Sequence, residues 1–180
     1  MDAVALNEFM ASAFQRELSW VIEHVGADGV TVRQPVGSGD LRPGGTVSGP
    51  TLMALADGVA YMVLLSQIGP AALAVTSNLN INFLRRPRPT DLVTKGRLLK
   101  LGRSLALVEV SMYSALDQTP EDSATFSIDE NSPLAHATVT YSLALLGGSE
   151  TPAADSTVPD SSEPRSGESN TTREPSHERS

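Results

Sequence analysis

The spacing of apolar residues predicts a helix, a hairpin and a second helix in the first part of the chain. Apolar positions recur every three or four residues across 4–16, which is typical of an amphipathic helix. Residues 18–25 and 29–36 have the short apolar runs of strands, and the turn signal at 26–29 joins them into an expected hairpin. A glycine-rich loop at 37–49 follows.

The second helix is predicted to begin at Pro50 and is apolar on nearly all sides. Ser48 or Gly49 can cap it, and a proline suits the first turn because its missing N–H costs nothing there. Gly69 and Pro70 end it. A helix that is apolar all round is expected to be buried on all sides.

Four strand-like segments follow this helix, at 75–83, 92–101, 104–113 and 134–145, with a long polar loop at 115–132. Alternation in the first segment places Thr76 on one face with Asn78, Asn80 and Asn82. The apolar residues Val75, Leu79, Ile81 and Phe83 lie on the other face with Ser77. Consecutive strands favour an antiparallel meander. The predicted fold class is therefore α+β, with an antiparallel sheet covering one central helix.

Composition separates a folded domain at 1–146 from a tail at 147–180. The tail is rich in Ser, Pro and Glu, has no aromatic residue and carries seven acids and three bases, so we expect it to be disordered. The domain holds fourteen acids and ten bases. An acidic balance argues against general nucleic-acid binding.

Other features restrict the chemistry and the location. The chain has no cysteine, which excludes disulfides and thiol nucleophiles, and its histidines have no metal-ligand spacing. No metal or other cofactor is expected. Asp2 and Glu8 lie where a signal peptide needs positive charge, and the apolar run at 53–65 is too short to span a bilayer. A cytoplasmic protein without a membrane partner is the expectation.

Seven of the domain's ten bases lie between Arg85 and Arg103, with only Asp91 against them. This basic strip fits a small polyanionic ligand. It equally fits solvated strand edges, where basic side chains prevent edge-to-edge pairing.

Asp57 is the only charged residue between Arg42 and Arg85, and it lies within the apolar helix. A carboxylate in such a setting is costly to bury without a partner, and groups kept there are enriched at functional sites. Because Gly58 follows, Asp57 could instead mark a turn or cap a second short helix. The unbroken apolar periodicity around it favours the functional interpretation.

The order of these elements resembles the hotdog fold, a curved antiparallel sheet wrapped around a long helix. The local motifs resemble those of PaaI-like acyl-CoA thioesterases over residues 28–146. That family carries His-Gly-Gly and Leu-Ala-Asp on the helix, then Phe-Leu-Arg-Pro and a Gly-Arg or Gly-Lys turn. The corresponding residues here are 48–50, 55–57, 83–87 and 102–103.

The resemblance implies hydrolysis of an acyl-CoA thioester to a free acid and CoA. Asp57 would be the general base or the nucleophile, and the Gly49 N–H would stabilise the oxyanion at the helix N-terminus. Ser48 and Thr76 fall at further catalytic positions of the family. Residues near the strand ends would bind CoA: Arg42, Arg85, Arg86, Gly102 and Arg103. The family builds one site from two subunits, which implies at least a homodimer, with a homotetramer expected.

Two departures from the family pattern keep other functions open. Ser48 replaces the usual histidine, and Arg42 falls near a usual asparagine. These losses motivate a non-catalytic acyl-CoA-binding module as the alternative. A hotdog hydratase or dehydratase is a further alternative, but such enzymes use an Asp-His pair, and no histidine follows Asp57 until His136.

Overall fold

The computed structural model describes residues 1–14, 20–70, 73–116 and 127–143 of the chain. The predicted tail at 147–180 lies outside these residues, as does most of the loop predicted at 115–132. Two helices and eight strands are described: α1 (Ala3–Phe14), β1 (Val21–Gly26), β2 (Gly29–Gln34), β3 (Leu41–Arg42), β4 (Thr46–Val47), α2 (Gly49–Ile68), β5 (Val75–Phe83), β6 (Leu92–Leu101), β7 (Leu105–Ser114) and β8 (Ala135–Ser142).

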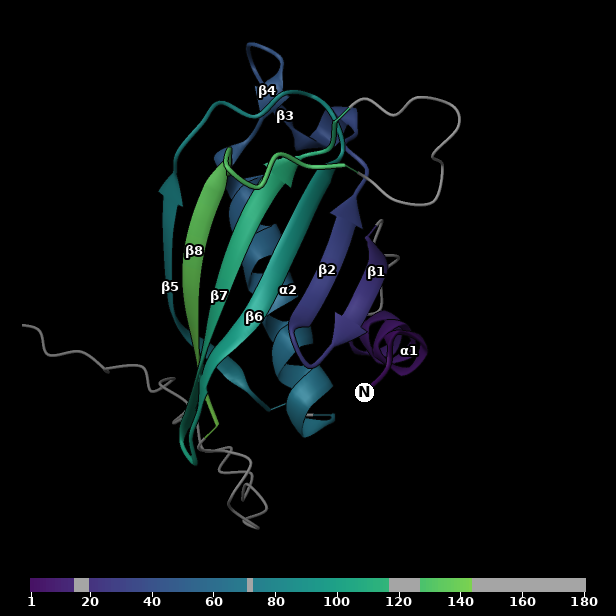
Figure 1. Cartoon of the computed structure of the whole chain (residues 1–180), viewed down its shortest axis with the longest axis vertical. Helices are drawn as coiled ribbons and strands as arrows, with labels where there is room; N and C mark the ends of the chain where they lie inside the picture. Colours follow the sequence, from purple (N-terminus) through teal and green to yellow (C-terminus); the bar gives the residue numbers. More distant parts are fainter. Residues whose placement is uncertain (15–19, 71–72, 117–126, 144–180) are drawn as a thin grey trace, which may run out of the picture. The chain divides into compact units, whose positions relative to one another are not determined.

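Six of the strands form one antiparallel sheet in the order β1-β2-β6-β7-β8-β5. The sheet curves along its length and α2 runs across one face of it (Figure 1). The strands β3 and β4 form a separate small hairpin beside the start of α2. The predicted meander is confirmed as β6-β7-β8, and the central helix against a six-stranded sheet is the hotdog arrangement.

The core lies between α2 and the sheet. Ten residues of α2 are buried, and they pack on the buried residues of β7 and β8, which alternate with half-buried ones. By length and composition α2 could cross a bilayer, but most of it is buried against this sheet, as in the core helix of a folded domain.

Both ends of α2 form as the sequence predicts. The Ser48 side chain accepts a hydrogen bond from the Thr51 N–H, and Pro50 lies in the first turn. Gly69 ends the helix with a φ of 79°, in the left-handed region that glycine tolerates. The helix runs without a break past Gly58, so the alternative in which Asp57 marks a turn or caps a second helix is wrong.

The predicted faces of β5 are wrong at its first residues. The pairing with β8 shifts between Thr76 and Asn78, so that Ser77 is an extra residue in the strand. Thr76 therefore pairs with the buried Tyr141 and faces α2, whereas Val75 faces outward with the asparagines. A simple alternation could not show this, because one extra residue moves every side chain before it to the other face.

Candidate functional site

Asp57 lies in the middle of α2, half-buried, where two hydroxyl groups from the sheet meet it. Thr76 Oγ1 of β5 donates a hydrogen bond of 2.7 Å to Asp57 Oδ1. The Tyr141 phenol of β8 lies 2.9 Å from the same oxygen and 2.9 Å from the main-chain carbonyl of Asp57. The lone carboxylate of the apolar helix thus has polar partners from two neighbouring strands.

Tyr141 is the second hydrogen-bond donor to Asp57, beside Thr76. Burial raises the pKa of the Tyr141 phenol far above its ordinary value, and the nearby Asp57 carboxylate adds to the rise. The phenol therefore stays protonated across the ordinary pH range. Its ring stacks on Tyr61 of α2, with centroids 5.8 Å apart. Sequence reasoning gave Tyr141 no role, although a buried tyrosine hydroxyl needs a polar partner.

In the first turn of α2, one backbone N–H group has no hydrogen-bond partner among the described residues. The Thr51 N–H is bound by Ser48 Oγ, and Pro50 has no N–H. The Ser48 hydroxyl is also within 2.8 Å of Thr51 Oγ1, so it serves the helix cap. The Gly49 N–H makes no hydrogen bond within the described part of the chain. Gly49 therefore offers the free amide that an anion or oxyanion would use at a helix N-terminus.

Gly49 lines a cleft of about 420 Å³ together with Arg42, Thr46, Val47, Leu52, Phe83, Leu84, Arg85, Arg86 and Pro87. A Cβ on Gly49 would lie 3.6 Å from the Phe83 ring, so the glycine leaves the floor of this cleft open rather than relieving a clash. Arg42 is exposed at this cleft. The structure thus brings Gly49, Arg42, Arg85 and Arg86 together.

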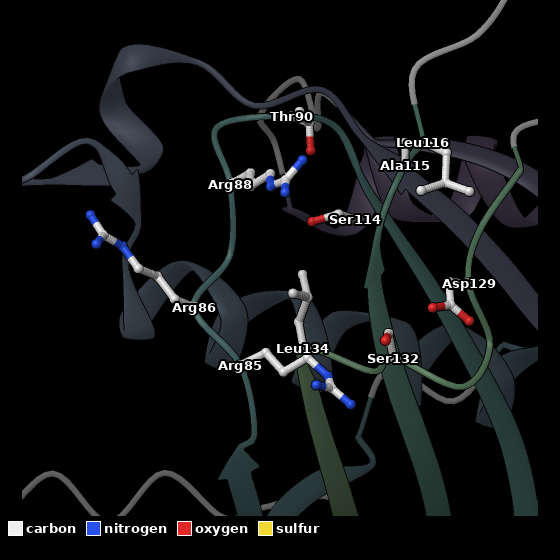
Figure 2. Close-up of a pocket in the computed structure, with 10 residues that line it drawn as sticks. All are labelled: Arg85, Arg86, Arg88, Thr90, Ser114, Ala115, Leu116, Asp129, Ser132 and Leu134. Carbon is white, nitrogen blue, oxygen red and sulfur yellow. The ribbon is translucent and has the colours of Figure 1, made fainter.

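A second pocket of about 360 Å³ shares Arg85 and Arg86 with this cleft and adds Arg88 (Figure 2). Arg86 donates to the Gly44 carbonyl at 3.1 Å and points away from the pocket. Arg85 and Arg88 have no hydrogen-bond or ion-pair partner among the described residues. Thr90 Oγ1 and Ser114 Oγ, also in this pocket, are buried hydroxyls without a partner in the same residues. Sequence reasoning counted Arg88 in the basic strip without giving it a role of its own, and it missed Thr90 and Ser114.

Gly102 and Arg103 lie elsewhere. They form the turn between β6 and β7, closed by a hydrogen bond of 2.9 Å from the Gly102 N–H to the Leu105 carbonyl. This turn is at the opposite end of the sheet from the segment that carries Arg85 (Figure 1). The ten residues of β6 separate them, a span of about 33 Å. Within one chain, the structure does not bring Arg103 to Arg85 and Arg86.

Comparison with known proteins agrees with this architecture. The Thioesterase superfamily matches residues 44–121. A proposed thioesterase of Silicibacter sp. TM1040 is 38% identical in sequence, with a TM-score of 0.65 over 79% of this chain and 91% of that one. The chain therefore belongs to the thioesterase superfamily.

Two more distant relatives are also similar. A phenylacetic acid degradation-related protein of Ralstonia eutropha JMP134 is 24% identical, with a TM-score of 0.57 over 74% of this chain and 98% of that one. A proposed esterase of Thermoplasma acidophilum is 20% identical over 103 residues, which are 57% of this chain and 77% of the relative. The first of these supports the fold.

Proposed function

We propose that the protein is an acyl-CoA thioesterase that hydrolyses a thioester to a free acid and CoA. The observation that carries the proposal is the half-buried Asp57 carboxylate held by two hydroxyl groups on the central helix. Asp57 either takes a proton from water as it attacks the thioester carbonyl, or attacks that carbonyl itself to form an anhydride that water then cleaves. In both routes the C–S bond breaks and CoA leaves as the thiolate, which is then protonated.

The negative charge that develops on the thioester oxygen needs a donor. The Gly49 N–H supports this role because it is unpaired within the described residues and lies at the positive end of the α2 dipole. The neighbouring arginines would hold the CoA phosphates, since Arg85 and Arg88 have no partner among the residues that the structure describes. The hydroxyl of Ser48 contributes by holding the helix start in place.

The two halves of this site belong to different subunits in the proposal. Asp57 lies eight positions after Gly49 on the helix, a rise of about 12 Å, which is too far for both to act on one carbonyl group. An oligomer, at least a dimer, would bring Gly49 of one chain to Asp57 of the other. The edge strand β5 supports this, because within the described part of the chain it pairs only with β8, and its Val75 and Phe83 side chains are each 53% exposed. The homotetramer and the cytoplasmic location stay predictions.

A binding module without turnover is the second candidate. The observation that favours it is the Ser48 hydroxyl, which replaces the family's histidine and is already bound within the helix cap. A hydratase has less support. His136, the histidine that follows Asp57 in the chain, bonds to Glu109 and faces away from α2, so it forms no Asp-His pair with Asp57.

The proposal is tested by measuring CoA release from a panel of acyl-CoAs of different chain lengths. Asp57→Asn keeps the shape of the side chain and an oxygen for the two hydroxyl donors, but it removes the base. We expect kcat to fall by about 10²–10⁴-fold. Asp28→Asn, at an exposed hairpin carboxylate, is the matched control and should be as active as wild type. Binding of acyl-CoA without any turnover by the wild type would instead establish the binding module.

A further inference from the structure

Two hydroxyl groups donate hydrogen bonds to the same carboxylate oxygen of Asp57, and neither donates to the other oxygen. Both the Thr76 and the Tyr141 hydrogen bonds reach Oδ1. Oδ2 makes no hydrogen bond within the described part of the chain. The two carboxylate oxygens therefore differ in their surroundings, although rotation about the Cβ–Cγ bond would otherwise exchange them.

Tyr141 holds the carboxylate more firmly than a single hydrogen bond would. Its phenol is 3% exposed as a residue and lies 2.9 Å from both the side-chain and the main-chain oxygen of Asp57, so it ties the side chain to its own backbone. The Tyr61 ring, one helical turn beyond Asp57, stacks on the Tyr141 ring and limits its movement. The phenol remains a donor because its proton is not lost in the ordinary pH range.

We propose that Tyr141 is a positioning residue for the reaction. It fixes Oδ1 against α2, so that Oδ2 is the oxygen that activates water or attacks the thioester. The inference rests on the proposed thioesterase function and adds to it the reacting atom and the residue that selects this atom. Holding a reacting group in one orientation lowers the barrier, and a hydrogen bond to the carboxylate favours its ionised form.

Tyr141→Phe removes the hydroxyl and keeps the ring and its stacking on Tyr61. The lost hydrogen bond to a charged group corresponds to a fall in kcat of about ten- to hundredfold, with little change in KM. Tyr113→Phe makes the same chemical change on the outer face of β7 and should behave as wild type.

A purely structural role for Tyr141 would lower the melting temperature and leave the kcat of the folded enzyme unchanged. That result would overturn the proposal. Thr76→Val provides a second check, because Thr76 and Tyr141 bind the same oxygen. The double variant should lose more activity than the two single losses combined, since only then is Oδ1 released from both donors.

Carbon NMR of the Asp57 carboxyl group keeps the proposal testable apart from catalysis. Tyr141→Phe should change the chemical shift of this signal at a fixed pH, because the carboxylate loses a hydrogen-bond donor, and Tyr113→Phe should not. A wild type without acyl-CoA hydrolysis would refute the proposed function, and the NMR shift would then decide whether Tyr141 holds the carboxylate. An active wild type, an inactive Asp57→Asn and an unchanged Tyr141→Phe would refute the role of Tyr141 alone.

Discussion

Gly49 and Asp57 stand on the same rigid helix, about 12 Å apart along its axis, and no side-chain rotation brings the Gly49 amide to the Asp57 carboxylate. Each residue offers a group suited to catalysis. Gly49 has an N–H at the helix N-terminus that is unpaired within the described residues, and Asp57 has a half-buried carboxylate with hydroxyl partners. If they act on one thioester, they must come from two copies of the chain.

Mixing two inactive variants tests this arrangement directly. Gly49→Val would block approach to the amide, and Asp57→Asn would remove the base, so each alone should be inactive. A mixed dimer holds one site with both wild-type residues and one with neither. Random mixing of equal amounts should therefore restore about a quarter of the wild-type activity, because half the dimers are mixed and each has one working site. The measurement is CoA release after co-refolding.

The control for that mixing is Asp57→Asn combined with a chain that carries both substitutions, which should stay inactive. A protein whose site lies within one chain would show no recovery in either mixture. Gly49→Val should fold, because the added Cβ would meet only the Phe83 ring, at an ordinary 3.6 Å.

The arginines around the two pockets are expected to recognise the phosphates of CoA. Arg85→Ala and Arg88→Ala should each raise KM for an acyl-CoA by about tenfold or more, and leave KM for the matching acyl-pantetheine, which lacks the nucleotide, unchanged. Arg97→Ala is the control, since Arg97 pairs with Glu109 on the outer face. Equal effects on both substrates would show that these arginines act on something other than the phosphates. Arg103→Ala tests whether the opposite end of the sheet also contacts the ligand.

The helix and its carboxylate could be predicted from the sequence because their signals are local. Ser48, Pro50 and Gly69 mark the ends of α2, and an apolar run with one charge marks Asp57. The partners of Asp57 depend on the register of distant strands. Thr76 faces the helix only because Ser77 is an extra residue in β5, and Tyr141 is 84 residues from Asp57 in the chain. Both contacts depend on how the strands pair, and no local sequence pattern predicts that pairing.

Gly96 lets α2 pack closely on β6, and a methyl group there should destabilise the fold. A Cβ would lie 2.8 Å from Val63 Cγ2 and 2.9 Å from Val59 Cγ1, closer than such atoms approach. Gly96→Ala should therefore reduce the free energy of unfolding by about 1–3 kcal/mol, measured by urea denaturation. Gly39→Ala, where a Cβ meets nothing within 4 Å, should have little effect. Adding Val63→Ala should recover part of the loss if crowding is its cause.

Glu109 makes the outer face of the sheet sensitive to acid. The hydrogen bond from His136 holds the pKa of Glu109 below its ordinary value of 4.5, against burial, and Arg97 adds to the effect. Because the pKa is lower in the folded state, the unfolded chain takes up the proton first as the pH falls. The contribution of Glu109 to the free energy of unfolding is therefore complete above its unfolded-state pKa. It is lost as the pH falls through the lower pKa of the folded state. Glu109→Gln should therefore lower the free energy of unfolding at neutral pH. The decrease in that free energy on acidification should be smaller in this variant than in wild type.

The check is the urea midpoint at about pH 6 and about pH 3.5, a window that covers this titration. The difference between the two midpoints should be smaller in Glu109→Gln than in wild type. Glu8→Gln, at an exposed carboxylate on α1 without a partner among the described residues, should keep the full wild-type difference. His136→Asn should reduce the difference as Glu109→Gln does, because it removes the main cause of the lowered pKa. An undiminished difference in both variants would mean that the Glu109–His136 pair does not set the acid sensitivity.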